Sequence, residues 1–421
     1  MMIDRTHMPP VSNQFSLKMI TPDRELIGET PFYFIDGGDE EVLKIEIIYQ
    51  AGTAYESLSL QSSTVNELIG EGTAKHTAQQ INQWVDDYGA FIQRDVSRDH
   101  AAFTLFCLHK HLDAVLPFFV EMMNESSFPE DEVIINIKNR KARFESHLQK
   151  VEFVCRNEFS RLLFGAHPYG RAVKLDDYNH ITNDVLKSFY ASHYLSGTKT
   201  VFVSGKINDK VKEIISRHWH TDGKGIVQES LPEPDKFQPV QEHISMPNAI
   251  QSAIRIGKPM ITITHPDYPM LNVANTIFGG YFGSRLMKNI REEKGFTYGI
   301  GSALHSFQQA GLFVIATEVG EEYTAQTLEE IQKELRNMHE TLVPEEEVEV
   351  AKNYILGNFL KTVDGPFAQA ELIKLMVLKN MPFDFFNQYL NQIRETSSEQ
   401  VLQMMNSYLK PDSLAQLVVG K

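Results

Sequence analysis

Fifteen histidines lie along this chain, and their spacing bears on whether the chain could hold a catalytic metal. The closest pairs are His109 with His111 and His218 with His220, each separated by one residue. Such a pair on a strand can share one metal ion, because residues two apart point to the same face. No acidic residue or cysteine stands at a fixed spacing that would complete a ligand set. We therefore predict that these are surface or turn histidines.

Two runs of three acidic residues, 130–132 and 345–347, could also be considered as cation ligands. Each run follows a proline and precedes a helical pattern of apolar residues. Acidic side chains in the first turn of a helix interact favourably with the helix dipole. The position of these runs therefore predicts helix N-termini rather than metal ligands.

The two acidic runs belong to an internal repeat. Several segments of the first half recur in the same order in the second half, with one small insertion between them. Such ordered matches indicate two homologous halves. The matching segments are 128–133 with 343–348, 200–206 with 415–421, and 102–106 with 312–316, at offsets of 215, 215 and 210 residues.

Each half follows one plan of strands, a helical stretch, further strands, long helices and a closing strand. We predict an α+β fold of two homologous α/β-sandwich halves, residues 1–220 and 248–421. Residues 221–247 between them are rich in glycine and proline, which is typical of an extended exposed linker. Two halves joined in this way are expected to close face to face as a clam-shell chamber.

Composition restricts the classes of function. The formal net charge is −15, from 40 basic and 55 acidic residues, which argues against nucleic-acid binding because a phosphate backbone needs a basic face. Two cysteines in 421 residues are typical of a reducing compartment. Residues 1–10 do not resemble a signal peptide, and no apolar run is long enough to span a membrane. We expect a soluble cytoplasmic protein without a membrane partner.

Residues 279–298 read GGYFGSRLMKNIREEKGFTY, a Gly-rich turn and Ser-Arg-Leu followed by Arg291 and Tyr298 seven residues apart. This segment resembles the C-terminal signature of the pitrilysin and mitochondrial-processing-peptidase family. Three further segments agree with it: Gly72-Thr73, the Phe-Gly-x-His-Pro-Tyr-Gly run at 164–170, and Val-Ser-Gly at 203–205. The resemblance covers nearly the whole chain and includes the two-half organisation.

Active members of that family are zinc peptidases with His-x-x-Glu-His on a helix just before a Gly-Thr pair. A further Glu about 76 residues on completes the three protein ligands. Counting back from Gly72-Thr73 places Ser63 and Glu67 at the histidine positions and Asn66 at the general base; counting forward places Arg143 at the third ligand. Serine is a poor zinc ligand and asparagine cannot accept a proton. We expect no zinc on this chain and an ion pair between Glu67 and an arginine.

For Arg291 and Tyr298, in contrast, the resemblance implies a role in binding and cleaving the substrate. In the family, this pair points into the chamber opposite the zinc. The Arg can hold substrate carbonyl or carboxylate groups, and the Tyr hydroxyl can donate to the oxygen that becomes negative during peptide attack. In isolation, Arg291 would be one charge of a solvated run and Tyr298 an ordinary strand residue.

Some members of the family divide the zinc motif and the Arg/Tyr pair between two chains. The sequence therefore favours the non-metal subunit of a heterodimeric zinc peptidase, with zinc in a homologous partner subunit and peptides as substrates. The alternative is a catalytically inactive structural or peptide-binding homologue, which could also self-associate. A self-sufficient zinc protease is disfavoured, because no His-x-x-Glu-His occurs anywhere in the chain.

Overall fold

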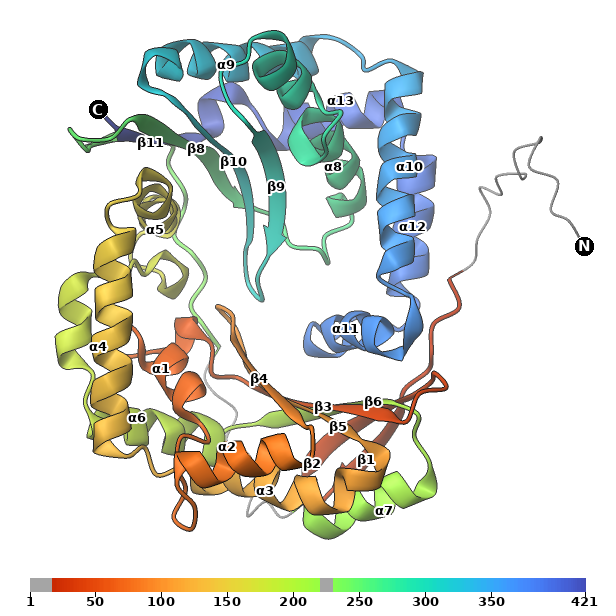
Figure 1. The fold of residues 1–421 in the computed structure, drawn as a ribbon. Helices are drawn as coiled ribbons and strands as arrows, with labels where there is room; N and C mark the ends of the chain where they lie inside the picture. The colour runs from red at the N-terminus through yellow and green to blue at the C-terminus, as the bar shows by residue number, and fades with distance from the viewer. Residues whose placement is uncertain (1–16, 220–229) are drawn as a thin grey trace, which may run out of the picture.

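The computed structural model describes residues 17–219 and 230–421. Two mixed β-sheets organise them, one in each half of the chain (Figure 1). The first sheet has six strands in the order β1-β2-β6-β3-β5-β4. Its strands are β1 Asp23–Ile27, β2 Thr30–Asp36, β3 Val42–Tyr49, β4 Phe91–Val96, β5 Ala101–Leu108 and β6 Lys199–Gly205.

The second sheet repeats five of these strands in the equivalent order β7-β11-β8-β10-β9. In both sheets the chain-terminal strand of the half, β6 or β11, pairs parallel to one neighbour and antiparallel to the other. The predicted two-half α+β fold is therefore confirmed. The strands are β7 Gln241–Ser245, β8 Gln251–Met260, β9 Ile300–Ser306, β10 Gly311–Gly320 and β11 Ala415–Gly420.

Strand register tests the repeat residue by residue. Gly205 and Gly420 end β6 and β11, as the 215-residue match predicts. The 210-residue match is wrong by two residues, because following the pairing across each sheet makes Thr104 equivalent to Ala316 rather than Val314. A slip of two keeps every side chain on its face, so the apolar pattern alone could not detect it.

Helices cover the outer face of each sheet (Figure 1). α4 and α10 both begin directly after a proline with three acidic residues in the first turn, which confirms the predicted N-termini. The helices of the first half are α1 Gln61–Leu68, α2 Ala78–Asp87, α3 Leu112–Glu125, α4 Glu130–His147, α5 Val151–Phe164, α6 Asn183–Tyr190 and α7 Asp209–His218. Those of the second half are α8 Tyr268–Asn275, α9 Thr324–Glu340, α10 Glu345–Lys361, α11 Gly365–Leu378, α12 Phe385–Glu395 and α13 Ser398–Tyr408.

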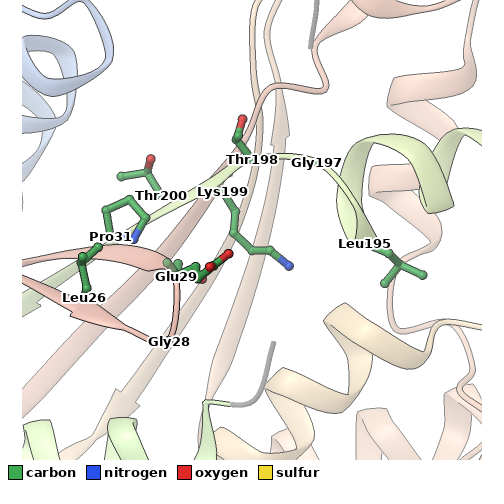
Figure 2. A pocket seen from close by; sticks show the side chains of 10 residues that line it. Leu26, Gly28, Glu29, Pro31, Leu195, Gly197, Thr198, Lys199 and Thr200 are labelled. Carbon is green, nitrogen blue, oxygen red and sulfur yellow. The ribbon is translucent and has the colours of Figure 1, made fainter. Parts of the chain in front are cut away.

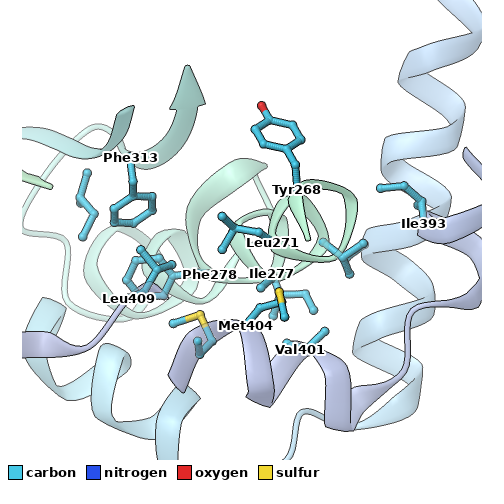
Figure 3. Packing of buried hydrophobic residues seen from close by; sticks show 14 of the residues in the cluster. Tyr268, Leu271, Ile277, Phe278, Phe313, Ile393, Val401, Met404 and Leu409 are labelled. Atoms are coloured by element: carbon cyan, nitrogen blue, oxygen red, sulfur yellow. The ribbon is translucent and has the colours of Figure 1, made fainter. Parts of the chain in front are cut away.

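α8 is the counterpart of α1 and continues as a π-helical turn, η6 Thr276–Gly280, so residues 272–278 are helical throughout. Figure 3 shows its apolar face, where Leu271 and Phe278 pack with Phe313 of the sheet and Met404 of α13. A fully buried side chain of this size stabilises the fold by about 1.5–3 kcal/mol.

The halves exchange one helix each. α5 belongs to the first half but packs on β8 and β11 of the second sheet, with Cys155 and Phe159 in an apolar cluster that includes Leu417. α11 belongs to the second half and packs on β2 and β6 of the first sheet (Figure 1). The halves are thus joined through packed helices as well as through the intervening segment.

The linker prediction needs correction at its end. Residues 241–245 form β7, an edge strand that pairs parallel to β11. Before it, Leu231 and Phe237 pack against the cluster under α5, which an exposed linker would not do. Residues 221–229 of the predicted linker, and the N-terminal segment 1–16, lie outside the described residues. Within the described parts of the chain, no helix is long and apolar enough to cross a membrane.

Candidate functional site

Helix α1 carries Ser63, Asn66 and Glu67, as the sequence predicts. Its first turn is held by the carboxylate of Glu56, whose Oε1 accepts a hydrogen bond from the Ser62 backbone N–H at 2.7 Å. Burial raises the pKa of Glu56 to about 7, although this hydrogen bond and Arg171 act in the opposite direction. Glu56 therefore combines a helix-capping role with a carboxylate that titrates near neutral pH.

The cation that meets α1 is Arg140 of α4. Its Nη2 donates to Ser63 Oγ at 2.7 Å, and its Nη1 lies 3.5 Å from Glu67 Oε2. Its Nη1 also donates to Thr64 Oγ1. The ion pair expected for Glu67 is thus formed, but by Arg140. Arg143, the residue chosen by counting, is exposed one turn further along α4.

Asn66 at the general-base position is an internal structural residue. It is buried, and its Nδ2 donates to the Asp95 carbonyl at 3.0 Å and the Ala102 carbonyl at 3.3 Å. Its Oδ1 accepts from the Tyr194 hydroxyl at 3.2 Å. These bonds fix α1 to the ends of β4 and β5, and they leave no basic atom that could accept a proton from water.

These residues do not fit a zinc ion. Tetrahedral zinc needs three or four N, S or carboxylate ligands around one point. Here a guanidinium lies against both former histidine positions, and a second cation at that point would be repelled. Across residues 17–219 and 230–421, no three His, Cys, Asp or Glu side chains are grouped so that they could hold a metal ion. His109, His111 and His218 belong to no such group, and His220 lies outside the described residues.

A second arginine next to α1 was not anticipated from the sequence. Arg94 of the edge strand β4 donates through Nε and Nη2 to the Ile69 carbonyl at 3.0 and 2.8 Å, and lies 3.7 Å from Glu71. Burial raises the pKa of Glu71, an effect that Arg94 opposes. Two Glu–Arg pairs therefore occupy the region around α1. The only sequence signal was an arginine within an alternating strand.

Arg291 lies in the last turn of a π-helix, η7 Met287–Glu293, that follows the Gly-rich turn. Its guanidinium carbon lies 4.6 Å from the ring centroid of Phe282. No hydrogen bond or ion pair of this guanidinium is found with the described residues. A charged group with unused donors at the surface is available to an incoming ligand.

Tyr298 is 96% exposed, and its local backbone explains why. Thr297 Oγ1 is tied to the Glu318 carbonyl at 2.7 Å, and Ile300 is buried at the start of β9. The chain is thus anchored on both sides of Tyr298, and its side chain points outward. Its hydroxyl makes no hydrogen bond to any described residue, so the donor is free.

Tyr298 borders a pocket of about 390 Å³ that both halves line. Glu152 of α5 forms an ion pair with Arg255 of β8 at 3.0 Å across this pocket. Burial and the neighbouring Glu152 carboxylate raise the pKa of Glu318, against the effect of Arg255. Arg291 is not among the residues that line this pocket, so the structure does not bring the two predicted residues into one cavity.

Figure 2 shows a different pocket of about 440 Å³, between the β1–β2 turn and the segment that leads into β6. Lys199 lines it, and burial lowers the pKa of its ammonium group. None of the site residues predicted from the sequence lines this pocket.

Two sequence models of one peptidase family match the chain. The model described as insulinase (peptidase family M16) matches residues 44–173, and the model described as peptidase M16 inactive domain matches residues 180–355. Fold and site define a protein with the architecture of this peptidase family, in which Arg140 contacts Ser63 and Glu67 of α1. The chain belongs to peptidase family M16, which confirms the predicted family.

Curated relatives are distant in sequence. YmxG of Bacillus subtilis (strain 168), described as an uncharacterized zinc protease, is 20% identical over 349 residues, or 81% of this chain and 83% of that protein. YmfF of the same organism, described as a probable inactive metalloprotease, is 26% identical over 234 residues, or 54% of this chain and 52% of that protein.

Solved structures share the fold closely. A peptidase M16 inactive domain from Pseudomonas fluorescens superposes with a TM-score of 0.87 at 24% identity, covering 95% of this chain and 97% of that one. A protease from Helicobacter pylori gives a TM-score of 0.85 at 17% identity, covering 96% and 100%. At these identities the likeness concerns the fold alone.

Proposed function

We propose that this chain is the non-metal-binding subunit of a zinc-dependent peptidase. It would contribute Arg291 and Tyr298 to peptide substrates, while a homologous partner subunit carries the zinc. Together the two chains would enclose the substrate chamber. The proposal rests on family membership and on a relative described as an inactive metalloprotease.

The main support for the proposal is a difference between α1 and the Arg291/Tyr298 pair in whether their polar groups are free to bind a ligand. Those on α1 are used internally, by Arg140 and by the Asn66 hydrogen bonds. Those of Arg291 and Tyr298 have no partner among the described residues, and Tyr298 is almost fully exposed. Hydrogen-bond donors that are not used within the chain are available to a bound peptide.

The chemistry assigned to the pair follows from these free donors. The Tyr298 hydroxyl can donate a hydrogen bond to an oxygen that gains negative charge during attack on a peptide. Arg291 can hold a carbonyl or carboxylate group of the same peptide through its planar fork of donors. Both residues would act on a reaction whose metal and water are supplied by the partner.

Steady-state kinetics on the chain reconstituted with its zinc-bearing partner test the proposal. Tyr298→Phe removes one hydroxyl and should lower kcat by roughly 100- to 1000-fold. Arg291→Ala should raise KM as well as lower kcat. Lys288→Ala, an exposed charge on the same π-helix, is the control and should change little. A Tyr298→Phe rate within about twofold of wild type would favour the alternative, an inactive structural or peptide-binding homologue.

A further inference from the structure

Phe282 is exposed to solvent and takes no part in the apolar core. Its side chain is 62% exposed and belongs to none of the three apolar clusters of the described residues. The ring contact found for it is with Arg291, whose guanidinium carbon lies 4.6 Å from the ring centroid. At this distance a guanidinium is attracted by the electrons of an aromatic face.

The Gly-rich turn holds Phe282 in place through its neighbours. The ring of Tyr281 packs on Tyr354 of α10, with centroids 5.0 Å apart. A Cβ on Gly283 would stand 2.8 Å from the Tyr281 ring, so a larger residue there would require this ring to shift. Ser284 is fully buried, and its backbone N–H donates to the Tyr281 carbonyl at 3.1 Å. Phe282 is therefore the exposed residue of an otherwise anchored turn.

The π-helix beneath Arg291 is anchored in the same way. Asn289 Nδ2 donates to Glu330 at 2.9 Å and to Glu334 at 2.7 Å, and Lys294 pairs with Glu330 at 3.2 Å. The Arg291 side chain lacks such a partner. Without the ring, its long flexible chain would sample many rotamers and would lose that freedom on binding a ligand.

We propose that Phe282 is a positioning residue, which holds the Arg291 guanidinium over its ring so that the guanidinium donors stay available to a substrate carbonyl or carboxylate. This inference rests on the proposed function and adds a residue to the same site. The ring offers no hydrogen-bond acceptor atom, and a guanidinium has five N–H donors, so contact with the ring and binding of a ligand are compatible.

The experiment measures KM and kcat of the reconstituted pair with three substitutions at residue 282. Phe282→Leu keeps an apolar side chain but removes the aromatic face, and should raise KM by about 2- to 5-fold with kcat nearly unchanged. Phe282→Ala should do at least as much. Phe282→Trp offers a larger aromatic face and should keep KM near wild type. Phe383→Leu, at another exposed phenylalanine, is the matched control and should have no effect.

A double-mutant cycle separates positioning from a general surface effect. In an Arg291→Ala background, Phe282→Leu should have no further effect on KM, because the residue it positions is gone. Direct binding of a labelled, uncleaved peptide to the isolated chain, followed by fluorescence anisotropy, should show the same pattern without the partner. Thermal unfolding of each variant checks that the exposed substitution leaves the fold intact.

Two results would overturn the inference in different ways. In the first, Arg291→Ala raises KM but Phe282→Leu leaves KM unchanged, or Phe282→Leu raises KM equally in the wild-type and Arg291→Ala backgrounds. The positioning role is then wrong and the proposed function stands. If Arg291→Ala itself changes neither KM nor peptide binding, the proposed role of Arg291 fails and the inference fails with it.

Discussion

A single guanidinium decides the chemistry of helix α1. Arg140 contacts Ser63 and Glu67, so both former histidine positions are tied to one cation from α4. This ion pair and hydrogen bond link α1 to α4. Such a pair stabilises little at the surface, but Arg140 has only 14% of its side chain exposed.

The first prediction restores metal binding at the residue scale. Ser63→His and Glu67→His combined with Arg140→Glu should bind one zinc per chain, because two histidines one turn apart and a facing carboxylate meet the ligand requirement. The wild-type chain should bind no stoichiometric zinc. Metal analysis after dialysis measures both. The control variant carries the same two histidine substitutions with Arg143→Glu in place of Arg140→Glu, and it should not bind zinc. Zinc bound to this control with equal affinity would show that Arg143 faces the site.

Glu56 predicts a pH dependence of stability. Burial raises the pKa of Glu56 from its usual 4.5 to about 7, so the folded chain holds a proton that the unfolded chain releases between these values. The contribution of Glu56 to the free energy of unfolding should therefore be fully present below pH 4.5 and be lost, by about 3 kcal/mol, as pH rises through 7. Urea titrations at several pH values should show a flatter profile for Glu56→Gln. Equal slopes for the two proteins would contradict this role.

At the scale of elements, α11 is fixed to the first sheet by alternating charges. Lys374 lies 2.7 Å from Glu46 and 2.6 Å from Glu371, and Lys44 lies 3.1 Å from Glu46. Burial opposes the charge of Lys374, but Glu46 and Glu371 outweigh it and raise the pKa of Lys374. Glu46, with 7% of its side chain exposed, depends on both lysines for compensation of its charge.

Breaking this contact should loosen the exchanged helix. Lys374→Met should cost about 3 kcal/mol in the free energy of unfolding, because it leaves the buried Glu46 with one cation instead of two. Glu371→Gln should cost below about 1 kcal/mol, since half of the Glu371 side chain is exposed. Urea denaturation gives both values. A cost for Lys374→Met no larger than that for Glu371→Gln would mean that Lys44 alone compensates Glu46.

At the scale of the whole molecule, the exchange of α5 and α11 couples the two halves. The hairpin tips of the two sheets also meet, where Asp99 Oδ2 accepts from the Gln308 backbone N–H at 2.9 Å and Oδ1 accepts from the Tyr169 hydroxyl. Arg98 lies over the ring of Phe307 at 4.6 Å. Contacts of this kind hold one half to the other independently of the linker.

The halves should therefore unfold together. Scanning calorimetry of the full chain should show one transition with equal calorimetric and van't Hoff enthalpies, because separating the halves would expose the apolar faces of both exchanged helices. Asp99→Ala should lower the midpoint without splitting the transition. Two resolved transitions would show that the halves are independent folding units.

The sequence by itself determined the repeat, the family and the missing zinc ligands. The matching segments occur in the same order in both halves, because both halves have the same strand order. The absence of His-x-x-Glu-His is a property of residue types and needs no coordinates.

Only the tertiary structure decided which residues meet. Counting along the sequence selected Arg143, but Arg140 lies three residues away on the same helix face and is the residue that meets Glu67. The buried face of α5 is apolar, which predicts burial but not the sheet that buries it. The role proposed for Phe282 depends on the contact of its ring with Arg291, which is nine residues further along the chain. In each case the pattern along one element sets its own burial, while the partner depends on how separate elements pack in space.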